Sequence, residues 1–120
     1  MESGKKPHLI GVVGPCAAGK TTLVVNLKKY GLLTRHIAQE HSYVADMWQR
    51  LTNPDVLVFL DASFQVTMMR RKLDWSLEDY NEQHYRLRHA REHADLYIFT
   101  DHMTSEEVLT TVLKFLGIDS

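Results

Sequence analysis

Residues 14–21 read Gly-Pro-Cys-Ala-Ala-Gly-Lys-Thr, which matches the pattern G-x-x-x-x-G-K-[ST]. Its two glycines permit backbone angles that other residues avoid, so the chain can curl its amide N–H groups around an anion. A helix that begins here adds the positive end of its dipole at the same place. The lysine would reach phosphate oxygens, and the threonine hydroxyl can ligate Mg²⁺. The stretch therefore predicts a phosphate-binding loop.

The segments on either side of this loop agree with that interpretation. Before it, residues 9–13 form a short apolar run rich in β-branched side chains, which is typical of a buried strand. After it, apolar residues recur at helical spacing until Gly31, so we expect a helix over about 19–30. A loop placed directly between a strand and a helix is the setting that phosphate binding requires.

The rest of the chain alternates between strand and helix patterns. Apolar runs predict further strands over 32–38, 56–60 and 96–99. Capping residues and helical spacing predict helices over 44–51, 63–72, 76–93 and 104–117. This alternation favours an α/β fold of three layers, in which helices cover both faces of a parallel sheet of about four strands.

Length, charge and cysteine content narrow the classes of function. A chain of 120 residues favours one domain spanning 1–120. With 14 basic and 15 acidic residues the net charge is −1, so we expect no nucleic-acid partner held by bulk charge. The longest apolar run, 56–60, is far too short to cross a membrane, and the first six residues do not resemble a secretory signal. Cys16 is the only cysteine, so a cytoplasmic location without disulfides is expected.

The loop makes the chain resemble the P-loop nucleoside triphosphate-binding proteins, and two later segments resemble their small-molecule and nucleotide kinase branch. Residues 54–63, PDVLVFLDAS, followed by Arg70, are similar to a strand and helix of those kinases in which the helix ends in a nucleotide-contacting arginine. Residues 94–101, ADLYIFTD, are similar to their final strand. The resemblance extends over most of the chain, but the lid insertion and paired arginines usual in these kinases are not evident after Arg70.

The resemblance implies that the protein binds ATP, or another nucleoside triphosphate, together with Mg²⁺. It further implies transfer of the γ-phosphoryl group to an unknown small-molecule acceptor. The alternatives are an NTPase or nucleotide-dependent switch, and a binding module that works with a protein partner or as a homo-oligomer. The residues expected to bind the nucleotide are Gly14, Pro15, Cys16, Ala17, Ala18, Gly19, Lys20, Thr21, Thr22 and Arg70.

Two acidic residues compete for the second protein contact to the metal, beside the hydroxyl of Thr21. Asp61 directly follows a buried apolar run, which is the common local pattern. Glu40 follows the 32–38 strand, which we expect beside the strand that leads into the loop. Ligands gather at the carboxyl ends of such neighbouring strands. We therefore favour Glu40 as the metal-binding and catalytic carboxylate over Asp61, and expect residues 39–48 to face the acceptor.

Arginines in the helix expected over 76–93 offer a further contact. With about 100° between successive residues, Arg88 and Arg91 fall within an apolar stripe, whereas Arg86 points the opposite way. An arginine in a half-buried stripe needs an anionic partner. One possibility is that Arg88, Arg91 or both contact the nucleotide, which would make them catalytic together with Lys20. The others are an ion pair with Asp74, Glu78 or another acid, and side chains that extend their charged ends into solvent.

Overall fold

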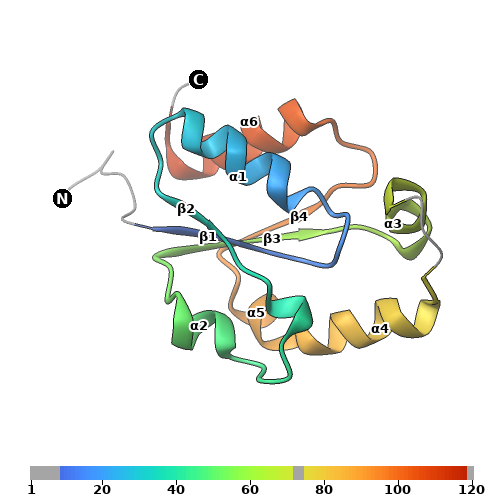
Figure 1. Cartoon of the computed structure of the whole chain (residues 1–120). Coiled ribbons are helices and arrows are strands. Elements are labelled where there is room, and N and C mark those ends of the chain that lie inside the picture. Colours follow the sequence, from blue (N-terminus) through green and yellow to red (C-terminus); the bar gives the residue numbers. More distant parts are fainter. Residues whose placement is uncertain (1–8, 72–74, 119–120) are drawn as a thin grey trace.

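The computed structural model describes residues 9–71 and 75–118, and its four strands form one parallel sheet (Figure 1). The strands are β1 (Ile10–Val13), β2 (Thr34–His36), β3 (Val56–Asp61) and β4 (Leu96–Phe99). Their order is β2-β1-β3-β4, so β1 lies between β2 and β3, with Val12 paired to His36 on one side and to Val58 on the other. The expected parallel sheet of four strands is confirmed.

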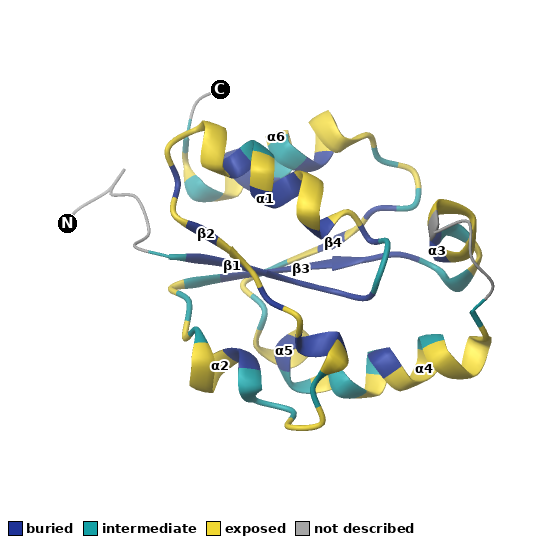
Figure 2. Cartoon of the chain, in the orientation of Figure 1, coloured by how far each residue is buried: buried dark blue, intermediate teal, exposed yellow. Residues whose placement is uncertain are grey.

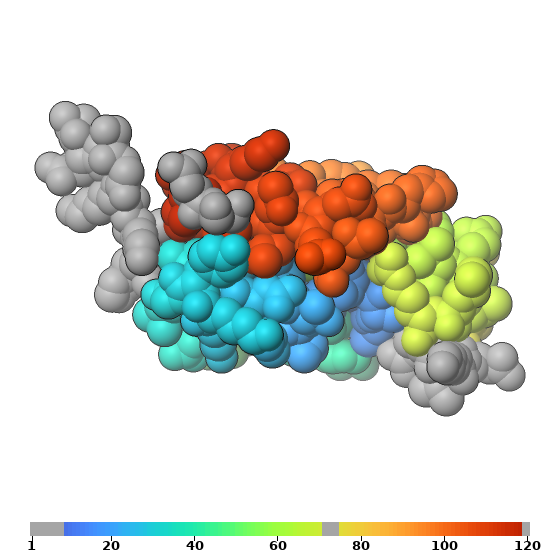
Figure 3. Space-filling view, turned by 90° about the horizontal axis from the view of Figure 1, so that it is seen from above, coloured from blue at the N-terminus to red at the C-terminus, as the bar shows by residue number. Residues whose placement is uncertain are grey.

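Helices cover both faces of this sheet, as the sequence predicted (Figure 1). They are α1 (Lys20–Lys29), α2 (Met47–Leu51), α3 (Phe64–Arg71), α4 (Leu77–Arg86), α5 (Arg88–His93) and α6 (Ser105–Leu116), with a short 3-10 turn η1 (Gln39–His41). The helices α1 and α6 lie side by side over one face, as Figure 3 also shows, and α2, α4 and α5 lie against the other. Within the described residues, no helix is long and apolar enough to span a bilayer.

The core consists of two apolar layers separated by the sheet. Alternate residues of β1 and β3 point to opposite faces, so Val12 and Val58 pack toward α1 and α6. Val13 and Phe59 pack toward α2 and α5. Figure 2 shows β1 buried along its length and β3 buried beyond its first residue, while the outer surfaces of the helices are exposed. Burial on both faces explains why these strands are continuous apolar runs.

Helix ends follow the sequence signals where capping residues are present. Ser76 and Thr104 each accept a hydrogen bond from the backbone N–H three residues later, and both capping boxes are complete. Gly117 ends α6 in the left-handed region, with a φ of 75°. Ser63 Oγ accepts from Val66 N at 3.2 Å and caps α3. The expected end of that helix near Lys72 lies outside the described residues.

Three elements differ from the sequence prediction. The strand expected over 32–38 is confined to Thr34–His36, because β2 is an edge strand paired only with β1. The helix expected over 44–51 begins at Met47, after a turn in which Met47 N bonds to Val44 O. The helix expected over 76–93 is divided at Leu87 into α4 and α5, although Leu87 N bonds to Gln83 O and Arg91 N bonds to Leu87 O.

Candidate phosphate-binding site

The loop between β1 and α1 needs glycine at two positions for different reasons. At Gly14, φ is 153° and a Cβ atom would lie 2.0 Å from the carbonyl oxygen of Leu60, so no side chain fits. At Gly19, the residue that precedes α1, the space is open but φ is 100°, which disfavours any L side chain. These two residues let the backbone pass close to the end of β3 and turn into the helix.

The start of α1 presents backbone donors that have no partner within the helix. The helical ladder includes the bond from Leu23 N to Gly19 O at 3.1 Å, and the amides of the preceding first turn have no acceptor within the helix. No acidic side chain occupies this first turn to neutralise the positive end of the helix. The exposed threonines Thr21 and Thr22 add hydroxyl groups at the same place. This end of α1 is therefore suited to an anion.

Lys20 lies at the mouth of the loop and is only 5% exposed. Its ammonium donates to the carbonyl oxygens of Gly14 at 2.6 Å and Pro15 at 3.0 Å, and to Glu40 Oε2 at 2.9 Å. Both ends of the Lys20–Glu40 ion pair are buried. The ammonium is thus held against the loop by its own backbone and by one carboxylate.

Glu40 reaches the loop because β2 pairs directly with β1, which confirms the strand adjacency on which its assignment depended. It belongs to η1, just beyond the carboxyl end of β2, and is 3% exposed. Its Oε1 atom is buried and has no hydrogen-bond partner among the residues that the structure describes. The neighbouring His41 places Nε2 at 3.6 Å from Glu40 Oε2.

A cavity of about 430 Å³ opens at the mouth of the loop. Its lining includes most of the residues expected to bind nucleotide or metal: Cys16, Ala17, Gly19, Lys20, Thr21, Thr22, Glu40 and Arg70. It also includes His36, which sequence reasoning did not single out. Gly14 and Pro15 lie beneath it as acceptors for Lys20. Asp61 is not part of the lining that the described residues form.

A second cavity, of about 320 Å³, adjoins the first between α1 and α6. Gly19, Thr22 and Arg70 line both cavities, and Ala18 faces only the second. The Arg70 guanidinium donates to Ala17 O at 3.1 Å and to the carbonyl and hydroxyl oxygens of Thr100 at 3.1 and 3.2 Å. These bonds hold an exposed arginine between the loop and the end of β4.

Arg88 and Arg91 do not take the inward positions that the helical angles predicted. Both are exposed, and neither lines the loop cavity. The Arg88 guanidinium lies 3.9 Å from the Tyr85 ring centroid, and that of Arg91 lies 5.0 Å from the Tyr97 ring centroid. The buried residues here are Gln83, Leu87 and Ala90, at helical spacing, and Arg88 and Arg91 each follow a buried residue by one position, which turns them about 100° away from the buried face.

Two residues of α4 that sequence reasoning did not assign to the site contact the loop region instead. Gln83 Oε1 accepts from Cys16 N at 3.0 Å, and Gln83 Nε2 donates to Cys16 Sγ at 3.2 Å. Arg86 Nη1 donates to Glu40 O at 3.4 Å, and its guanidinium lies 4.4 Å from the Tyr43 ring centroid. No local signal marks these contacts, because they depend on how α4 packs against η1.

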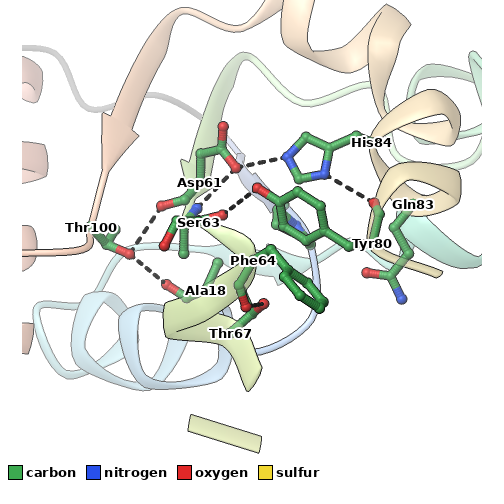
Figure 4. Close-up of polar contacts among 12 residues, drawn as sticks. Ala18, Asp61, Ser63, Phe64, Thr67, Tyr80, Gln83, His84 and Thr100 are labelled. Carbon is green, nitrogen blue, oxygen red and sulfur yellow. Dashed lines mark hydrogen bonds and ion pairs between the residues drawn. The ribbon is translucent and has the colours of Figure 1, made fainter. Parts of the chain in front are cut away.

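The Asp61 carboxylate is occupied by a different set of partners (Figure 4). His84 Nε2 lies 2.9 Å from Asp61 Oδ1, Tyr97 OH donates to Oδ2 at 2.5 Å, and Ala62 N donates to Oδ1 at 2.9 Å. Burial favours the uncharged forms of Asp61 and His84. The hydrogen bond between the two side chains, together with their other contacts, favours the charged forms more strongly. The pKa of Asp61 is therefore lowered, and that of His84 is raised.

These two shifts define a pH window for stability. Because folding raises the pKa of His84, its imidazolium stabilises the fold at pH values below 6.5, the ordinary pKa of histidine. This contribution is lost as the pH rises through the raised pKa of the folded protein. Because folding lowers the pKa of Asp61, its carboxylate stabilises the fold at pH values above 3.8, the ordinary pKa of aspartate. This contribution is lost as the pH falls through the lowered pKa of the folded protein. The pair is most stabilising between the two ordinary values.

We expect His84→Gln to lower the free energy of unfolding by about 1–2 kcal/mol near pH 5.5 and by less near pH 8.5, because a charge-assisted hydrogen bond is lost only where the imidazole is protonated. Urea unfolding at both pH values measures this. The exposed His102 is a matched control, and His102→Gln should change stability by less than about 0.5 kcal/mol at either pH. An equal loss for His84→Gln at both pH values would contradict the charged pair.

No protein-family model and no curated protein sequence matches this chain.

Proposed function

We propose that the protein binds a Mg²⁺–nucleoside triphosphate, with ATP as the first candidate, and transfers its γ-phosphoryl group to a small-molecule acceptor. One observation carries the proposal. The buried ammonium of Lys20 lies at the mouth of a glycine-shaped loop that opens a helix, and it faces the carboxylate of Glu40. Backbone donors, a lysine and an acidic residue at one helix start are the groups that position and neutralise a triphosphate.

The second cavity supports a nucleotide rather than a bare phosphate. Its walls include the apolar side chains of Leu23, Leu60, Met103 and Val108, and it adjoins the loop cavity. Apolar walls with a few polar groups suit a nucleobase. Arg70 lies where the two cavities meet, at a position from which its charge would reach the phosphates.

The residues present also fit a magnesium ion. Glu40 offers a buried carboxylate oxygen without a partner, and Thr21 offers an exposed hydroxyl on the same cavity. Both are oxygen ligands of the kind that Mg²⁺ takes beside phosphates. When bound, the ion would neutralise charge on the transferring phosphoryl group. The approach of a triphosphate would draw the Lys20 ammonium toward the phosphates and away from Glu40, which frees the carboxylate.

A third cavity favours transfer to an acceptor over simple hydrolysis. It measures about 420 Å³ and is lined by His36, Gln39, His41, Ser42 and Trp48 among others, within or next to the segment expected to face the acceptor. His36 lines this cavity and the loop cavity, so the two are adjacent. Burial and then the charge of Lys20 lower the pKa of His36, which favours a neutral imidazole able to accept a proton.

We expect calorimetry to detect binding of Mg²⁺–ATP, or of another purine triphosphate, with a Kd below about 1 mM and weaker binding of the diphosphate, because Lys20 and the first turn of α1 would contact the terminal phosphate. The titration compares ATP, GTP and ADP with and without Mg²⁺. Absence of heat with every triphosphate at millimolar concentration would overturn the proposed function.

Following the labelled γ-phosphate then distinguishes a kinase from an NTPase. Labelled triphosphate is incubated with a panel of nucleosides, nucleotides and small alcohols. Transfer of label to one of them supports a kinase, whereas release of inorganic phosphate alone supports an NTPase.

A further inference from the structure

Three side chains meet beside the loop, and the proposed nucleotide chemistry gives a metal-binding role to only one of them, Glu40. Cys16, Glu40 and His41 each place one ligand atom within 4.8 Å of the others. Cys16 Sγ lies 3.8 Å from His41 Nε2, and Glu40 Oε2 lies 3.6 Å from the same nitrogen. A thiol and an imidazole are ligands of Zn²⁺ and similar ions, whereas Mg²⁺ prefers oxygen.

The buried carboxylate supplies an independent sign of a missing ligand. Glu40 is 3% exposed, and its Oε1 atom is without a hydrogen-bond partner among the described residues. A buried polar atom that is left unpaired is unfavourable, and such atoms are rare in folded proteins. The other oxygen, Oε2, lies 3.6 Å from His41 Nε2, so the same carboxylate faces His41 and has capacity for a further partner.

The surroundings of the cluster suit a metal that retains an open position. His41 is 60% exposed at its side chain, and Cys16 is partly buried, so the cluster is open to solvent on one side. A fourth ligand would then be water, as in zinc sites with three protein ligands. Gln83 donates to Cys16 Sγ at 3.2 Å and orients the sulfur, which is the role of residues that support a metal ligand.

The charge of Lys20 opposes a cation here but does not exclude one. Its ammonium contacts Glu40 Oε2, yet it also donates to two backbone carbonyl oxygens of the loop. Those acceptors keep Lys20 partnered if Glu40 turns toward a metal. Binding deprotonates Cys16 and releases the thiol proton to solvent, so thiolate and carboxylate together balance the charge of the ion.

We propose that Cys16, Glu40 and His41 form a binding site for a thiophilic divalent cation such as Zn²⁺. Binding of this cation does not depend on the proposed function. One consequence does rest on it, since the site shares Glu40 with the proposed magnesium site. A cation held there blocks the mouth of the loop, so Zn²⁺ and Mg²⁺–nucleotide exclude each other.

Cobalt is the probe, because Co²⁺ bound to a thiolate absorbs in the near ultraviolet and Co²⁺ bound to oxygen does not. Titration of the full chain with Co²⁺, without nucleotide, should give this band at one ion per chain, and Zn²⁺ should abolish it. The Cys16→Ser variant should lack the band. We expect Glu40→Gln and His41→Ala to weaken Co²⁺ binding by about tenfold or more. The exposed His102 is the control, and His102→Ala should bind as the wild type does.

A measurement on the unaltered chain guards against a variant that fails to fold. Zn²⁺ should slow alkylation of Cys16 by iodoacetamide by about tenfold or more, because a metal-bound thiolate is a poor nucleophile. No band with the wild type, a band that persists in Cys16→Ser, or unchanged alkylation would each overturn the proposal. If the wild type shows the cobalt band but binds no triphosphate, the missing triphosphate binding refutes the proposed function, and the proposed metal site is retained.

Discussion

Replacing Lys20 with alanine should weaken Mg²⁺–triphosphate binding by about 100-fold or more, which corresponds to about 3 kcal/mol. Lys20 is the first residue of α1, and its ammonium is buried at the mouth of the loop. Alanine removes that charge from a site where solvent cannot replace it. Calorimetry under the conditions used for the wild type measures the loss.

The same change leaves the carboxylate of Glu40 buried without its cation, and breaking a buried ion pair costs about 3–5 kcal/mol of stability. Loss of binding must therefore be separated from loss of fold. The double variant Lys20→Met, Glu40→Gln removes both charges while retaining side-chain volume, and it should fold and still not bind. Lys29→Ala, at an exposed position in the last turn of α1, is the matched control and should bind normally. Wild-type affinity in the Lys20 variants would refute the role of Lys20.

The sequence predicted those parts of the molecule that depend on local rules. The two glycines around the loop, the buried strand before it and the helix after it are all local patterns, and the structure contains each of them. The capping boxes at Ser76 and Thr104 are likewise formed by residues three positions apart. Chain order also predicted that the strand before Glu40 would lie beside β1.

The contacts that the sequence did not predict join residues far apart in the chain. Gln83 bonds to Cys16 across 67 positions, and His84 contacts Asp61 across 23. A pattern within one helix cannot reveal a partner on another element. The buried face of the 77–93 region is also decided by packing, because Gln83, Leu87 and Ala90 are the residues that it buries. The expected stripe included Arg88 and Arg91, which lie one position beyond this face and are exposed.

Variants of Glu40 and Asp61 test which of these two acidic residues binds the metal. We expect Glu40→Gln to lower metal-dependent turnover by about 100-fold, or about 3 kcal/mol in the barrier, because the amide keeps the shape of the side chain and loses the charge that a metal requires. Asp61→Asn should reduce turnover per folded molecule by less than about tenfold, since its carboxylate is bound to His84 and Tyr97. Turnover measured against Mg²⁺ concentration compares them.

Each variant should also carry a signature that the other lacks. In Glu40→Gln, Lys20 no longer has to leave an ion pair to reach the phosphates, so kcat should fall while the KM for nucleotide does not rise. In Asp61→Asn, the lost carboxylate removes the charged partner of His84, so the free energy of unfolding near pH 5.5 should fall by about 1–3 kcal/mol. The reverse pattern, with turnover abolished in Asp61→Asn and retained in Glu40→Gln, would move the metal to Asp61. Such a result would require the Asp61 carboxylate to exchange His84 and Tyr97 for the metal, because both of its oxygens already have partners.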